Sequence, residues 1–170
     1  MQNTQHLLVG TSNIPISKWN ILVNSQSIKD NSDISAVLTP FFPGNANIAA
    51  NIIAPTAEGY FDLDFNFTGT DVSFSYNINT IVDPNSPVSD LVATGYQVDN
   101  GPIITFSDNT TITNTIRLAD NIQTKKYRIY VKWKDDGTAT MTNAQDTASA
   151  IAENNNAIFD VNVNFTQVTE

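Results

Sequence analysis

Strict alternation of apolar and polar residues dominates this chain and limits the folds open to it. In 61–67 every odd position is Phe or Leu, and every even position is Asp or Asn. The same alternation runs through 72–78, 127–134 and 159–165. A period of two places one face of a β-strand in an apolar core and the other in water. The chain is therefore expected to fold mainly as antiparallel β-sheets.

Turns separate these stretches from one another and from weaker strand patterns. The stretches 61–67 and 72–78 flank the glycine-containing segment Thr68–Asp71, which predicts a β-hairpin. With the weaker segments, about nine or ten short strands share one domain, so an all-β, antiparallel jelly-roll-type β-sandwich is expected. The weaker strand patterns are Trp19–Val23, Ile34–Leu38, Leu91–Val98, Ile103–Phe106 and Ile112–Leu118.

One segment departs from the β pattern. Between Asn143 and Glu153, alanines and Ile151 recur at helical spacing. Asn143 is a candidate N-cap, and Asp146 falls near the first turn, where a carboxylate is favourable. A short helix is therefore expected in a connection between strands.

The charge balance bears on partners. Seventeen acidic and eight basic residues leave a net charge of −9 over 170 residues, which disfavours nucleic acid as the main partner. The sequence also contains no long apolar stretch typical of a membrane span. Six of the eight bases lie between Arg117 and Lys134. This stripe is interpreted as one solvated sheet face or as a contact with an acidic neighbour, such as another copy.

Residues for common catalytic chemistry are scarce. His6 is the only histidine, cysteine is absent, and the seven glycines are scattered, so no zinc site, serine triad or phosphate-binding loop is indicated. Asp62, Asp64 and Asn66 imitate the start of a calcium loop, but Phe67 stands where that loop needs glycine. They are interpreted as the wet face of a strand. Neither an enzyme, nor a cofactor, nor a metal site is predicted.

Two groups of motifs span the chain from Lys18 to Gln167. The first group is a Trp strand ending in Val-Asn, then Ile-Ala-Pro, then a glycine before an alternating strand. The second group is a strand containing Trp, an Asp-Thr pair, and a last strand ending in Thr-Gln. These motifs lie in Lys18–Asn24, Ile53–Phe61, Thr70–Val72, Val131–Trp133, Asp146–Thr147 and Phe159–Gln167. In this order and spacing they resemble the pattern of the TasA/camelysin-like family, although Thr56 departs from the glycine that the family often has.

The resemblance implies a secreted jelly-roll subunit of extracellular fibres, in a biofilm matrix or on a cell surface. In that family the subunits polymerise by donor-strand exchange, so other copies of this chain are the expected partners. Other matrix or surface proteins are further candidate partners. The sequence shows no secretion signal. Residues 1–13 are then the donor-strand segment, and 14–170 form a single sandwich domain. The alternative is that the same segment is the first strand of its own domain. The candidate donor strand is Gln5, His6, Leu7, Leu8, Val9 and Gly10.

Two other functions remain open from the sequence. A ligand- or carbohydrate-binding β-sandwich needs exposed aromatic rings, for which Tyr130 and Tyr96 are the candidates. Trp19 and Trp133 fall on apolar faces and are expected in the core. Some members of the TasA/camelysin-like family are labelled metallopeptidases, but this chain lacks the set of metal-ligating residues that such an activity needs.

Overall fold

A computed structural model describes residues 14–27, 40–107, 111–135, 142–151 and 156–169. Its helical elements are the 3-10 turn η1 (Leu118–Asp120) and the helix α1 (Asn143–Ile151). The strands are β1 (Leu22–Val23), β2 (Gln26–Ser27), β3 (Glu58–Asn66), β4 (Phe74–Val82), β5 (Leu91–Val98), β6 (Ile104–Thr105), β7 (Ile112–Ile116), β8 (Thr124–Trp133) and β9 (Phe159–Gln167).

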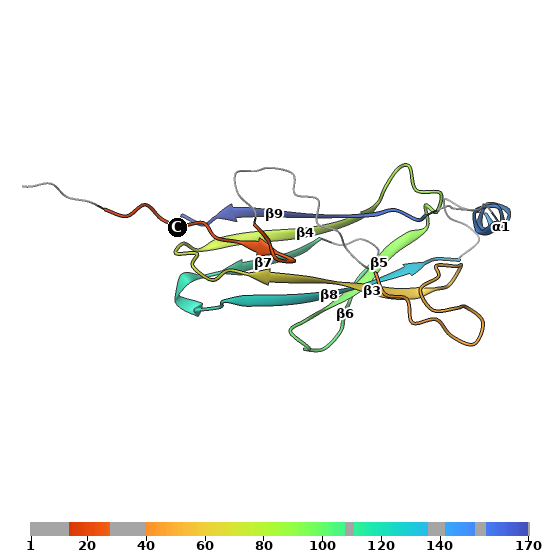
Figure 1. Cartoon of the computed structure of the whole chain (residues 1–170), viewed down its shortest axis with the longest axis horizontal. Helices are drawn as coiled ribbons and strands as arrows, with labels where there is room; N and C mark the ends of the chain where they lie inside the picture. Colours follow the sequence, from red (N-terminus) through yellow and green to blue (C-terminus); the bar gives the residue numbers. More distant parts are fainter. Residues whose placement is uncertain (1–13, 28–39, 108–110, 136–141, 152–155, 170) are drawn as a thin grey trace, which may run out of the picture.

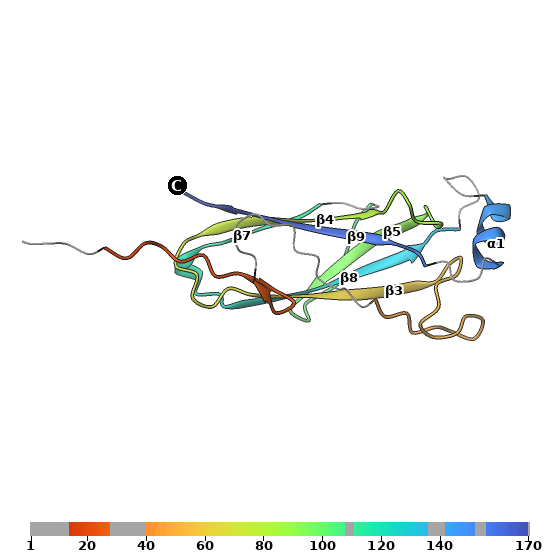
Figure 2. The ribbon, with the colours of Figure 1, turned by 45° about the horizontal axis from the view of Figure 1, so that its top comes forward.

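The strands form two antiparallel sheets that lie face to face. The larger sheet has the order β2-β1-β3-β8-β5-β6, and the smaller sheet has the order β7-β4-β9. Figures 1 and 2 show the two layers along the long axis of the molecule, with α1 at one end. The expectation of an all-β antiparallel sandwich with a short helix is confirmed at this level.

Alternation explains how the core is filled. Odd positions of β3, odd positions of β8 from Tyr127 on and even positions of β4 up to Thr80 are buried, while their neighbours are half-buried or exposed. Phe65 on β3 lies 5.2 Å from Tyr76 on β4, measured between ring centroids. The two Trp residues expected in the core do pack there: Trp133 is buried and Trp19 packs edge-on against Phe74.

The predicted hairpin between 61–67 and 72–78 is wrong. β3 belongs to the larger sheet and β4 to the smaller one, so the turn at 68–71 carries the chain from one sheet to the other. Phe67 and Phe74 consequently face each other across the core, with centroids 4.9 Å apart. Both a hairpin and such a crossing leave one apolar face per strand, and alternation alone does not distinguish them.

The helix is confirmed, but its cap is not Asn143. Thr142 precedes the helix, and its backbone N–H donates to Oε1 of Gln145 at 2.8 Å. The backbone N–H of Gln145 donates back to the Thr142 hydroxyl at 3.4 Å. This is a capping box with Thr142 as the N-cap. Trp133 Nε1 donates to the buried carboxylate of Asp146 at 3.3 Å, which fastens the helix to the end of β8.

The weaker strand patterns have mixed outcomes. Leu91–Val98 matches β5, whereas the other three described segments form shorter strands, β1, β6 and β7. The expected strand Ile34–Leu38 lies outside the described residues.

Candidate functional site

The first described residues form an extended leader that leaves the sandwich. Residues 14–17 are all exposed, with Ile14 at 82% and Ile16 at 89% of full exposure. The backbone joins the domain at Lys18, whose N–H donates to the Asp71 carboxylate and whose carbonyl accepts from the Asp71 N–H. The leader points away at the end opposite α1 (Figure 1). The candidate donor strand, Gln5–Gly10, lies outside the described residues.

Strand β9 has one open edge. Within the described residues it pairs with β4 alone, in an unbroken antiparallel register from Phe159 to Gln167. Just outside the strand, Val168 N–H donates to Ser73 O at 2.9 Å and Asp83 N–H to Ile158 O at 3.1 Å. Because backbone bonds alternate along antiparallel pairs, even-numbered residues of β9 bond to β4. The N–H and C=O groups of the odd-numbered residues therefore point to the free edge.

The side chains of these odd-numbered residues point toward the core but are incompletely covered. Phe159, Val161, Val163 and Phe165 pack against the core cluster, yet each remains only half-buried. In contrast, the inward residues of β3 are fully buried. The open edge of β9 thus combines unpaired backbone groups with exposed apolar surface, which is the condition for adding another strand.

An apolar hollow of about 590 Å³ continues this edge at the α1 end of the molecule. Phe159 and Val161 of β9 line it on one side, and Phe61 of β3 lines it on the other. Its lining also includes Leu91 and Trp133, which belong to a second buried cluster. Trp133, which lines the hollow, also bonds to Asp146 of α1. The hollow therefore lies near α1, whereas the leader leaves the sandwich at the other end (Figure 1).

Strand β3 has a closed edge on the side away from β8. At one end, Phe41 and Tyr60 exchange both backbone hydrogen bonds, at 2.7 and 3.0 Å. At the other end, Asn24 N–H donates to Asp64 O at 2.8 Å, and Asn24 Oδ1 accepts from the Asp64 N–H at 2.8 Å. Asn24 and Ser25 both have positive φ, so they form the two-residue turn of the β1–β2 hairpin. The sequence analysis missed Asn24, because its partner is 40 residues away.

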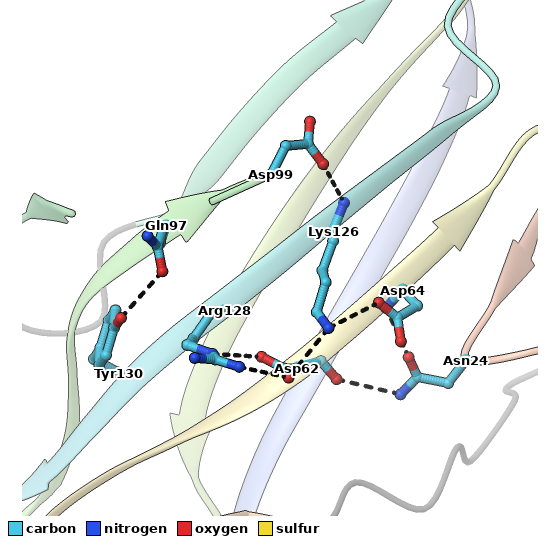
Figure 3. A network of polar contacts seen from close by, with 8 residues as sticks. All are labelled: Asn24, Asp62, Asp64, Gln97, Asp99, Lys126, Arg128 and Tyr130. Carbon is cyan, nitrogen blue, oxygen red and sulfur yellow. Dashed lines mark hydrogen bonds and ion pairs between the residues drawn. The ribbon is translucent and has the colours of Figure 1, made fainter. Parts of the chain in front are cut away.

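Three bases of the stripe, Lys126, Arg128 and Lys132, lie on the outer face of the larger sheet and are paired within the chain. Arg128 makes two hydrogen bonds to Asp62, at 2.9 and 3.1 Å, and Lys126 lies between Asp62 and Asp64 (Figure 3). Lys132 pairs with Glu58 at 2.8 Å. The Arg128 guanidinium lowers the pKa of Asp62 through these bonds. The solvated-face interpretation is confirmed for these three bases, as is that of Asp62 and Asp64. Lys125, at an odd position of β8, pairs instead with Asp99 at 2.9 Å.

The two candidate sugar-binding tyrosines lie on different faces. Tyr130 lies on the outer face, beside Tyr60, and its hydroxyl donates to Gln97 at 3.3 Å (Figure 3). Tyr96 instead packs inward against Phe106 and Tyr127, so its assignment to an exposed face is wrong. The β-bulge between Ala93 and Gly95 shifts the alternation of β5 and turns Tyr96 inward.

The described residues also lack two features that would indicate other kinds of function. No cluster of three or more His, Cys, Asp or Glu side chains is present there that could hold a metal ion. Across the same residues, no helix is long and apolar enough to cross a membrane. Comparison with known protein families and with curated proteins found no match for the chain.

Proposed function

We propose that this chain is a jelly-roll-type structural subunit of extracellular fibres, of the TasA/camelysin-like kind, and that it acts without catalysis. Copies join head to tail when the N-terminal segment of one subunit pairs with the β9 edge of the next. The observation that carries the proposal is the open edge of β9, with its half-buried side chains and the adjoining apolar hollow. The proposed setting is a biofilm matrix or a cell surface.

The placement of the two parts supports a linear polymer. The leader leaves one end of the sandwich (Figure 1), and Trp133, which lines the hollow, bonds to α1 at the other end. A subunit that offers a strand at one end and accepts a strand at the other forms a heterologous contact, which produces an open filament. Leader pairing with the same molecule's β9 would instead give a closed monomer.

The donor segment has the apolar content that such a junction needs. Leu7, Leu8 and Val9 are three consecutive aliphatic residues. In an added strand Leu7 and Val9 share one face, so burial of these two side chains at roughly 1.5–3 kcal/mol each gives a gross gain of about 3–6 kcal/mol per junction, before the entropy of ordering the segment. The exposed Ile14 and Ile16 extend this apolar character into the described leader.

Deletion of residues 1–12 tests the proposal. The shortened chain is expected to keep its β-sheet circular dichroism, because the described sandwich begins after them, and to form no filaments in electron micrographs. Replacement of residues 1–12 by a Gly/Ser segment of equal length controls for chain length. Filaments of normal length from either variant would contradict the proposal.

A further inference from the structure

The outer face of the smaller sheet is nearly free of charge, although the chain as a whole is strongly acidic. Asp160 is the only charged residue in β4, β7 and β9. The outer face of the larger sheet, by comparison, carries the ion pairs described above. The two outer faces therefore suit partners of different chemistry.

Two rows of hydroxyl and carboxamide side chains cross this uncharged face. In the strand register, Ser75 on β4 lies between Thr115 on β7 and Thr166 on β9. Two residues further along β4, Asn77 lies between Thr113 and Asn164 in the same manner. These six residues are called the polar rows.

A hollow of about 340 Å³ lies between the polar rows and is lined by all six of their residues. The intervening positions, Tyr76 and Asn114, have side chains that turn into the core. The Tyr76 hydroxyl lies 2.7 Å from that of Tyr127, and Asn114 Nδ2 donates to Tyr76 at 3.1 Å. The hollow is thus a shallow channel that crosses three strands, with polar walls.

The walls of the channel retain unused hydrogen-bonding groups. Asn77 Oδ1 accepts from Asn79 and Asn164, at 3.2 and 3.1 Å. Within the described residues, the Asn77 amide N–H groups, the Asn164 carbonyl and the hydroxyls of the three threonines in the polar rows have no hydrogen-bond partner. The channel therefore offers both donors and acceptors, with no charged group among the polar rows.

We propose that this channel binds a neutral polysaccharide chain lying across β7, β4 and β9. Binding would rest on hydrogen bonds and not on the exposed aromatic rings that the sequence analysis sought, because the only aromatic residue of the channel, Tyr76, is buried. Sugar hydroxyls both donate and accept, as the free groups of the polar rows require. A net charge of −9 repels anionic polymers, and the channel has no base to hold them. An extended peptide would gain more from the backbone groups of the β9 edge than from this face. The inference does not depend on polymerisation.

Affinity electrophoresis of the full chain tests this inference. Native gels that contain dextran, a mixed-linkage β-glucan or galactomannan provide neutral probes, and gels with alginate provide an anionic one. We expect at least one neutral probe, but not alginate, to retard the chain. Thr113→Val with Thr115→Val keeps the shape and strand propensity of two channel threonines, and removal of two hydrogen bonds should weaken retardation about tenfold. Thr124→Val, on the opposite sheet, is the matched control and should change nothing.

Each outcome is informative. Retardation that the Thr113/Thr115 double variant loses and Thr124→Val keeps supports the channel. Asn164→Asp, which preserves size and adds a charge, should show the same loss if the double variant does not fold. No retardation by any neutral probe, or equal retardation of all variants, overturns the inference. Self-association without glycan that only the channel variants lose would make this face a contact between copies, and would also overturn it.

Discussion

Strands β3 and β9 invite comparison, because both are nine residues long and alternate in the same way. Each is paired along its full length on one side, β3 with β8 and β9 with β4. On the other side, β3 is closed by the two-residue strand β1, by Asn24 and by Phe41, whereas β9 has no partner within the described residues. The difference teaches that closure comes from short segments beside the strand and not from the strand itself.

The largest expected effect comes from blocking the β9 edge. Val163→Pro removes an N–H that points to the free edge, so pairing with β4 should survive while a further strand cannot dock. Filaments should be lost completely, as judged by electron microscopy, with a folded monomer by circular dichroism. Asn162→Pro is the matched control, because its N–H bonds to β4 and its loss should unfold the sheet instead. Normal filaments from Val163→Pro would contradict an acceptor role for this edge.

Truncation of one aromatic residue on each strand compares how well the inward side chains of β3 and β9 are covered. Phe65 is 2% exposed, and Phe65→Ala should lower the free energy of unfolding of the monomer by roughly 3–5 kcal/mol. Phe165 lies 5.8 Å from it but is half-buried. Phe165→Ala should therefore cost less, about 1–2 kcal/mol. Urea denaturation measures both, and equal losses would mean that β9 is as well covered as β3.

Opening the β3 edge should have a smaller effect. Asn24→Ala loses the side-chain bonds to Asp64 N–H and Asp62 O and places alanine at a φ of 47°. A loss of about 1–2 kcal/mol in the free energy of unfolding is expected. Asn24→Gly keeps the backbone conformation and loses only the side-chain bonds, so it should cost about 1 kcal/mol or less. If Asn24→Ala leaves stability unchanged in urea denaturation, the edge is not closed by this residue.

The smallest effect concerns the ion pairs of the larger sheet. The pKa of Asp62 is lowered in the folded state. Its contribution to the free energy of unfolding is therefore fully present above the unfolded pKa of about 3.9, and it is lost as the pH falls through the folded pKa. Asp62→Asn should lower the free energy of unfolding at pH 7 by at most about 1 kcal/mol, and by less below pH ~4. Asp64→Asn is the control, because within the described part of the chain its single ion pair, with Lys126, is at 3.9 Å. An Asp62→Asn effect that grows toward acid pH would contradict this sign.

Periodicity predicted more of the strands than of their arrangement. The alternation identified the faces of β3, β4 and β8 and placed Trp133 in the core, because burial depends on each strand's own pattern. It could not assign β3 and β4 to different sheets, since both arrangements bury the same residues. It also could not show Asn24 reaching Asp64, or the bulge that turns Tyr96 inward, because each depends on contacts distant in sequence.

The candidate site was predictable only in part. Leu7, Leu8 and Val9 stand out from the sequence as an apolar segment near the N-terminus. The β9 edge does not, because an open edge and a closed edge carry the same alternating residues. The polar rows are equally hidden, since they combine residues of three strands that the register alone brings together.

The central claim, that the N-terminal segment of one subunit pairs with the β9 edge of another, is tested most directly by crosslinking between subunits. Because the chain has no cysteine of its own, only introduced thiols can react. His6→Cys and Asn162→Cys, an exposed position on β9, are made in separate chains, mixed, allowed to assemble and treated with a short thiol-reactive crosslinker. The account predicts crosslinked heterodimers between the two chains that require assembly. The account would be contradicted if the mixture gave no heterodimer while a chain carrying both substitutions became crosslinked only within itself.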